Sequence, residues 1–248
     1  MKKTIYVSIR LKQLLICLTA IMTVITVVFG LDIYHLKTNA QANASQIKDA
    51  PLIIIDPGHG GEDGGTSSSS GIIEKDINLS ISLKIEKLLS LYGFETLMTR
   101  EEDKLIYDSE CKTIREKKVS DIHNRMSILE KYPDSIFLSI HQNHFDKSKY
   151  CGAQVFYSKN NPESQIIAEC IQASVITNLQ PENTRLIKPC GTEIYLLYHA
   201  KSPAVMVECG FLSNGAEAQL LNDDEYQTKM CASIVHGLLT YLNSGASG

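Results

Sequence analysis

Three apolar runs in this chain each end at a residue that could do chemistry. His59 lies in a glycine-rich loop after the first run, His141 directly follows the second, and Glu208 directly follows the third. Short apolar runs of this kind indicate buried β-strands. Because ligands collect outside the carboxyl ends of strands in open α/β sheets, we expect the three side chains to meet at one sheet edge.

Two imidazoles and a carboxylate suggest a catalytic zinc site, since catalytic zinc takes three protein ligands and keeps a fourth position for water. His59 and His141 would supply two ligands, and Glu74, at the start of the helix that returns from the glycine loop, would supply the third. Glu62 and Asp63 are closer in sequence but lie on the loop itself. A lone Gly-His-Gly also fits a surface histidine in a tight turn, so the prediction depends on the other two ligands.

Glu208 is the candidate general base. Burial at the end of an apolar strand would raise the pKa of this carboxyl group towards the working pH. The alternative is a carboxylate that is simply solvated at the strand end. His144, three residues after His141, is a rival zinc ligand, but the turn after a strand need not point it back. We expect His144 to be a supporting or substrate contact.

Composition excludes one class of partner and indicates the state of the cysteines. The net charge is −4 and the lysines and arginines are dispersed, so nothing indicates binding to nucleic acid. Six cysteines follow Cys17, an even number that permits disulfides in an exported protein. They show no metal-binding spacing and several stand in apolar runs, so we expect free, buried thiols.

The N-terminus matches an export signal. Lysines and an arginine precede an apolar run over residues 14–31, which fits either a cleaved signal peptide or an uncleaved membrane anchor. We expect a leader over residues 1–31, a polar linker over 32–50, a catalytic domain over 51–243 and a tail over 244–248. The domain would therefore act outside the cytoplasmic membrane, and an uncleaved leader would hold it there.

Strands and helices alternate along the rest of the chain. The patterns predict strands over 52–55, 94–99, 135–140, 153–157, 192–198 and 204–208. They predict helices over 74–92, 163–179, 217–221 and 226–242, and a short helix through Arg125 that ends at Pro133. The charged stretch 101–120 is expected to be a solvated loop or helix face. Such alternation predicts a single α/β domain whose sheet is covered by helices on both faces.

Six sequence blocks, taken in order, resemble a known family. They are Ile55-Asp-Pro-Gly-His59-Gly-Gly, Glu74-Lys-Asp-Ile-Asn-Leu79, Thr99-Arg100, Asn124-Arg125, Ser139-Ile-His141-Gln-Asn143 and Val207-Glu208-Cys-Gly-Phe-Leu-Ser-Asn214. Together they resemble the zinc-dependent N-acetylmuramoyl-L-alanine amidases of bacterial cell walls, over residues 51–243. Each block alone is weakly specific for this family, whereas the six blocks in this order are a highly specific match.

The resemblance implies hydrolysis of the amide that joins N-acetylmuramic acid to the first L-alanine of the peptidoglycan stem peptide. It implies one Zn²⁺ per chain, with ligands His59, Glu74 and His141, and Glu208 as the catalytic carboxylate. Two further residues are implied to support the site, namely Asn143 and Arg125. The fold implied is a mixed, mostly parallel sheet flanked by helices.

A lone catalytic domain behind a leader resembles the spore-cortex, CwlD-type amidases of endospore-forming bacteria. Those enzymes remove stem peptides so that muramic acid can become muramic δ-lactam, and such a role would place this chain in the intermembrane space of a forespore. Some relatives need an activating protein partner. Two alternatives stay open: a zinc peptidase that cuts within the stem peptide, and a peptidoglycan-binding or regulatory protein without turnover.

Overall fold

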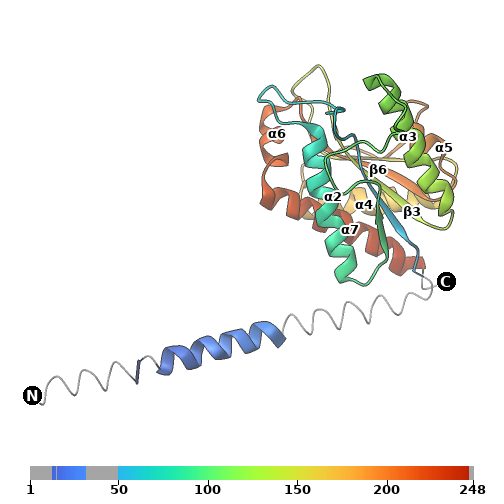
Figure 1. Ribbon diagram of the computed structural model, residues 1–248. Coiled ribbons are helices and arrows are strands. Elements are labelled where there is room, and N and C mark those ends of the chain that lie inside the picture. Colours follow the sequence, from blue (N-terminus) through green and yellow to red (C-terminus); the bar gives the residue numbers. More distant parts are fainter. Residues whose placement is uncertain (1–12, 15, 32–49, 246–248) are drawn as a thin grey trace, which may run out of the picture. The chain divides into compact units, whose positions relative to one another are not determined.

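The computed structural model describes residues 13–14, 16–31 and 50–245, which belong to two separate units, 1–46 and 47–248 (Figure 1). In the first unit, residues 16–31 are helical and exposed. No helix in the described parts of the chain is both long and apolar enough to cross a membrane. Most of the predicted linker, 32–49, and the end of the predicted tail, 246–248, lie outside the described residues.

The second unit is built on one six-stranded sheet. Its strands are β1 (Ile53–Pro57), β2 (Thr96–Met98), β3 (Ile136–Asn143), β4 (Gln154–Tyr157), β5 (Lys188–Pro189) and β6 (Ala204–Phe211). Their order is β2-β1-β3-β6-β4-β5, and every neighbouring pair is parallel except β4 and β6. The prediction of a mixed, mostly parallel sheet is confirmed.

Helices cover both faces of this sheet (Figure 1). They are α2 (Glu74–Leu91), α3 (Ile114–Lys131), α4 (Glu163–Asn178), α5 (Tyr195–His199), α6 (Gly215–Leu221) and α7 (Asp224–Gly245). Alternate residues of a strand point to opposite faces. Ile53 and Ile55 therefore pack with α2, α4 and α7, whereas Ile54 packs with α3 and α5. Burial on both faces explains why β1 reads as a continuous apolar run.

One predicted strand is wrong. Residues 192–198 contain no strand, and the short helix α5 occupies Tyr195–His199 instead. Leu196 and Leu197 of this helix are buried against the α3 side of the sheet. Because short apolar runs rich in β-favouring residues can form either element, tertiary packing decided between them. The two-residue strand β5, Lys188–Pro189, was not predicted.

Helix α3 is longer than predicted and begins inside the charged stretch 101–120. Its first residue is Ile114, and Thr113 caps it: the Thr113 hydroxyl accepts a hydrogen bond from the Glu116 amide, while the Glu116 carboxylate accepts one from the Thr113 amide. This reciprocal capping satisfies two amides that the first helical turn leaves without partners. The mixed charges of residues 115–118 are thus the solvated face of a helix.

The cysteines are all free, as expected. Cys190, Cys209 and Cys231 are buried, where thiols pack as small apolar groups. The expectation of burial fails for Cys151, which is exposed, and holds only in part for Cys111 and Cys170, which are half-buried.

Replacing Thr113 by alanine should lower the free energy of unfolding by about 1 kcal/mol, because one helix amide loses its partner. Thr228→Ala, in the exposed interior of α7, is the matched control and should be neutral or slightly stabilising. Urea denaturation followed by circular dichroism measures both. Equal effects in the two variants would contradict the capping role of Thr113.

Candidate metal centre and active site

The loop after β1 brings His59 towards the strand-end region of β3. His59 has a φ of 62°, a left-handed conformation that few residues other than glycine adopt. Two glycines let other groups approach closely: a Cβ on Gly58 would lie 2.2 Å from the His141 imidazole, and one on Gly65 would lie 2.4 Å from Glu74 Oε2. The glycine-rich sequence is therefore required by the packing of the two histidines and Glu74.

Glu74, the first residue of α2, lies between the two histidines and is buried, with 3% of its surface exposed. Its Oε1 lies 3.3 Å from His59 Nε2 and 3.0 Å from His141 Nδ1. The backbone amides of Thr66 and Gln142 donate hydrogen bonds to its two oxygens, at 2.8 and 3.1 Å. One carboxylate thus joins the glycine loop, the start of α2 and strand β3.

The three side chains fit a zinc ion. One ligand atom from each of His59, Glu74 and His141 lies within 4.8 Å of the others, so the group could hold a metal ion. Ligands at about 2.0–2.2 Å around a tetrahedral ion lie roughly 3.3 Å apart, close to the separations from Glu74 Oε1. His59 Nδ1 bonds to Asp63 Oδ2 at 2.8 Å, the kind of carboxylate contact that orients a metal-binding imidazole.

The charges of these groups are strongly coupled. Burial disfavours a charged His59, but its hydrogen bonds to Asp63 and Glu74 outweigh burial and raise the pKa of His59 to about 9. Burial likewise opposes ionisation of Glu74, yet hydrogen bonds from the two histidines hold the pKa of this carboxyl group far below its usual range. Glu74 is therefore ionised at neutral pH and could bind a cation.

Glu208 lies on β6 directly beside His141 of β3, in the register of the parallel pair. Its Oε2 is buried and has no hydrogen-bond partner within the part of the chain that the structure describes. Burial raises the pKa of Glu208 to about 7, against the lowering effect of His141. Both residues lie inside strands that run on to Asn143 and Phe211, so the predicted positions at strand ends are a few residues too early.

A buried ion pair holds the loop that carries His59. Arg125 of α3 pairs with Asp56 and donates hydrogen bonds to the carbonyl oxygens of Pro57 and His59, at 2.8 and 2.9 Å. Burial opposes ionisation of Asp56, but Arg125 outweighs it and, with hydrogen bonds from Thr99 and Ser139, lowers the pKa of this carboxyl group. Arg125 therefore acts on the backbone around the ligand and does not reach the ligand atoms themselves.

Asn143 and His144 follow His141 in the chain, and neither contacts the group of possible metal ligands through a hydrogen bond among the described residues. Asn143 ends β3 and its carbonyl oxygen accepts a hydrogen bond from the Leu212 amide at 2.9 Å. His144 is exposed and does not belong to the group of possible metal ligands. The expectation that His144 is a supporting or substrate contact stays a prediction.

Several supporting residues escaped the sequence reasoning. Asn78, fully buried, donates to the Gly58 carbonyl oxygen and to Glu74 Oε1, at 3.1 and 3.3 Å, and accepts from Gln142. Arg100 donates to the carbonyl oxygens of Pro57 and Gly58, at 3.0 and 3.1 Å. The spacing of Asn78, four residues after Glu74 on one helix face, was the available signal.

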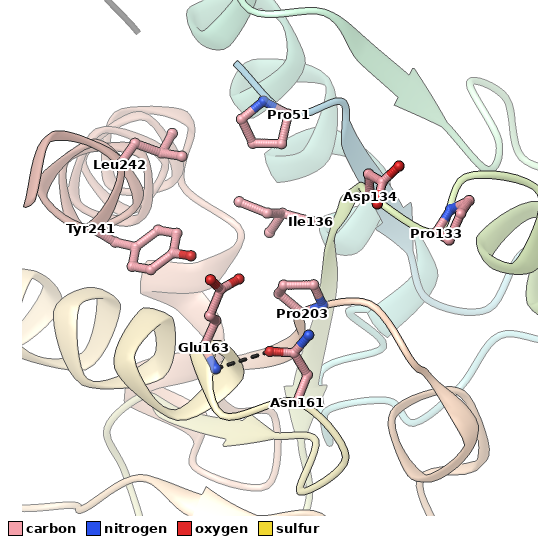
Figure 2. A pocket seen from close by; sticks show the side chains of 9 residues that line it. All are labelled: Pro51, Pro133, Asp134, Ile136, Asn161, Glu163, Pro203, Tyr241 and Leu242. Carbon is pink, nitrogen blue, oxygen red and sulfur yellow. Dashed lines mark hydrogen bonds between the residues drawn. The ribbon is translucent and has the colours of Figure 1, made fainter. Parts of the chain in front are cut away.

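The pocket in Figure 2 lies where strands β1, β3 and β6 begin, at the opposite ends of these strands from the candidate metal ligands. Pro51, Ile136 and Pro203 line it, and each precedes or begins one of the strands β1, β3 and β6. His59, His141 and Glu208 follow or lie near the other ends of the same strands. This pocket is therefore not part of the candidate active site.

The model of the N-acetylmuramoyl-L-alanine amidase family matches residues 53–240 of this chain. The chain belongs to this family. The germination-specific N-acetylmuramoyl-L-alanine amidase of Bacillus subtilis is 34% identical over 190 residues, which make up 77% of this chain and 79% of that protein. The predicted family and enzyme class are confirmed, and with them a peptidoglycan amidase activity.

Solved structures give the same result. The CwlD amidase from Clostridioides difficile, in complex with the GerS lipoprotein, is 41% identical with a TM-score of 0.76, covering 79% of this chain and all of that chain. The amidase AmiC2 of Nostoc punctiforme is 27% identical with a TM-score of 0.67, covering 78% and 97% of the two chains. The predicted resemblance to the CwlD-type amidases is confirmed.

Replacing Arg125 by methionine should lower the free energy of unfolding by about 3–5 kcal/mol, because Asp56 would stay buried without a counter-charge. Lys229→Met is the control, since its i,i+4 pair with Glu225 is exposed and its loss should leave stability nearly unchanged. Chemical denaturation at neutral pH measures both. A small loss in Arg125→Met would contradict the bracing role.

Proposed function

We propose that this chain uses one Zn²⁺ to hydrolyse the amide between N-acetylmuramic acid and L-alanine in peptidoglycan, with His59, Glu74 and His141 as the zinc ligands. The observation that carries the proposal is a donor set of two imidazoles and one buried carboxylate beside an unpartnered glutamate oxygen. When bound, zinc lowers the pKa of water from ~15.7 to ~7 and polarises a carbonyl group.

Glu208 is the proposed catalytic residue. Its Oε2 has no hydrogen-bond partner among the described residues, so it can accept a proton from the attacking water. The pKa of about 7 lets the same carboxyl group return a proton to the departing alanine nitrogen near neutral pH. Water adds across the amide bond and yields the muramic acid carboxylate and a free amino group.

Three other residues would support the reaction. Arg125 would fix the backbone on both sides of Gly58 and so hold His59 in its left-handed conformation. Asn143 and His144 would contact the substrate, since they follow His141 closely in the chain and are half-buried and exposed, respectively.

We further propose a spore-cortex role, in which stem peptides are removed so that muramic δ-lactam can form. Similarity to the germination-specific enzyme and to CwlD supports this. Because that CwlD structure contains a lipoprotein, a protein partner is also proposed here. Residues 1–31 would act as a signal peptide or membrane anchor, residues 32–50 as a linker to the 51–243 catalytic domain, and 244–248 as a tail, so the domain would work outside the cytoplasmic membrane.

Glu208→Gln should lower the rate of stem-peptide release by about 10²–10⁴-fold, because the amide cannot accept the proton. Bound zinc, measured by atomic emission, should stay unchanged, since Glu208 is not a proposed ligand. Glu169→Gln, on the exposed face of α4, is the matched control and should keep full activity. Persistent release by the Glu208→Gln protein would exclude the proposed role.

Digestion of a defined muropeptide in ¹⁸O-labelled water identifies the bond that is cut. An amidase places the label on the lactyl carboxylate of muramic acid, and chelation should stop the reaction until zinc is restored. Label on a carboxylate within the peptide would instead identify a zinc peptidase. Tight binding without any label, even with added zinc, would indicate a binding protein.

A further inference from the structure

A row of side chains leads away from the candidate metal centre across three strands. His141 of β3 is in register with Glu208 of β6, and Glu208 is in register with Gln154 of β4. Residues in register on neighbouring strands point to the same face of a sheet and lie next to each other. Gln154 is therefore the neighbour of Glu208 on the side away from His141.

Arg185 stands at the far end of this row. Its Nη2 donates a hydrogen bond to Gln154 Oε1, and Gln154 is itself fixed by a 2.6 Å hydrogen bond from Nε2 to the Leu186 carbonyl oxygen. The guanidinium lies over the Phe211 ring, 4.8 Å from its centroid. Neutral groups on two sides thus hold the guanidinium next to the catalytic strand.

The guanidinium has no carboxylate partner. Within the described part of the chain Arg185 forms no ion pair, whereas Arg125 pairs with both Asp56 and Asp121. Its Nε is buried and finds no hydrogen-bond partner among residues 50–245 or the described part of the N-terminal helix. A buried donor left unsatisfied destabilises the fold. A guanidinium that is held in place but lacks acceptors for its N–H groups is therefore unusual unless a bound group accepts the remaining hydrogen bonds.

A cleft gives access to this position. It has a volume of about 500 Å³ and is lined by Arg185, the one cationic side chain among its described lining residues, together with Asn183, Tyr226 and the carboxylates of Glu182 and Glu217. Both oxygens of Glu217 already accept backbone hydrogen bonds, from the amides of Gly152 and Phe211. A planar guanidinium matches the two oxygens of a carboxylate better than any other side chain does. The expected occupant of the position beside Arg185 is therefore an anionic group.

We propose that Arg185 is a specificity residue that binds a carboxylate of the stem peptide, and that Gln154 positions it. The inference rests on the proposed amidase function, because it places the peptide along the row from His141 through Glu208 to Arg185. A stem peptide whose carboxylate is amidated would lose this contact and bind less well.

Two synthetic N-acetylmuramoyl-dipeptides test the proposal, identical except for a free carboxylate or a carboxamide on the second residue. Calorimetry with the full-length Glu208→Gln protein measures binding without turnover, and the wild-type chain measures hydrolysis. Charge-assisted pairing predicts a preference for the free carboxylate of roughly 10- to 100-fold. Each further substitution is made in both of these proteins. Arg185→Gln should abolish the preference for the free carboxylate, and Arg185→Lys should keep part of it. Arg115→Gln, at an exposed position, is the control and should keep the full preference.

The outcomes separate this inference from the proposed function. Hydrolysis by the wild type without a preference between the two dipeptides would overturn the role of Arg185 alone. Equal losses on both dipeptides in Arg185→Gln would also overturn it, since Arg185 would then only balance the charges of Glu208 and Glu217. A binding preference for the free carboxylate without hydrolysis would instead contradict the proposed amidase function and still support a carboxylate-binding site at Arg185. Thermal unfolding of each variant checks that the fold is kept.

Discussion

The buried carboxylate of Glu74 is the contact on which the site depends. It accepts hydrogen bonds from two backbone amides and lies within about one hydrogen-bond length of both histidines. An ionised group taken out of water must be matched by donors or cations, otherwise its burial is strongly unfavourable. That requirement fixes the start of α2, the glycine loop and β3 relative to one another.

The second constraint is that the loop backbone must stay in one conformation. Arg125 and Arg100 donate to successive carbonyl oxygens around Gly58, and Asp56 holds Arg125 in place. Carbonyl oxygens in a buried turn cannot bond to water, so these guanidinium groups replace it. The left-handed conformation at His59 is thereby maintained by groups that never approach the ligand atoms.

Much of the fold could be predicted because its signals are local. Apolar runs located β1, β3 and β6, and helical periodicity located α2, α4 and α7. The mistake at residues 192–198 arose where a short apolar run fits either element and packing against α3 decides. The start of α3 was hidden because its first turn is charged, although the Thr113 and Glu116 pair is a readable capping signal.

In the candidate site, too, the residues with local sequence signals could be predicted, and those that depend on tertiary packing could not. His59, Glu74, His141 and Glu208 could be proposed because each follows or precedes a recognisable element. Gln142 and Arg185 could not, since their importance comes from partners more than 30 residues away in sequence. Asn78 is intermediate: its spacing from Glu74 is local, but its hydrogen bond to the Gly58 carbonyl oxygen is not.

Arg185 illustrates the limit best. It belongs to the connection before β5, and only the antiparallel pairing of β4 with β6 brings Gln154, and through it Arg185, beside Glu208. A parallel β4 would have needed a long crossover and could not have followed β3 through a short loop. The one antiparallel pair among the described strands therefore also places Gln154, and with it Arg185, next to the strand that carries Glu208.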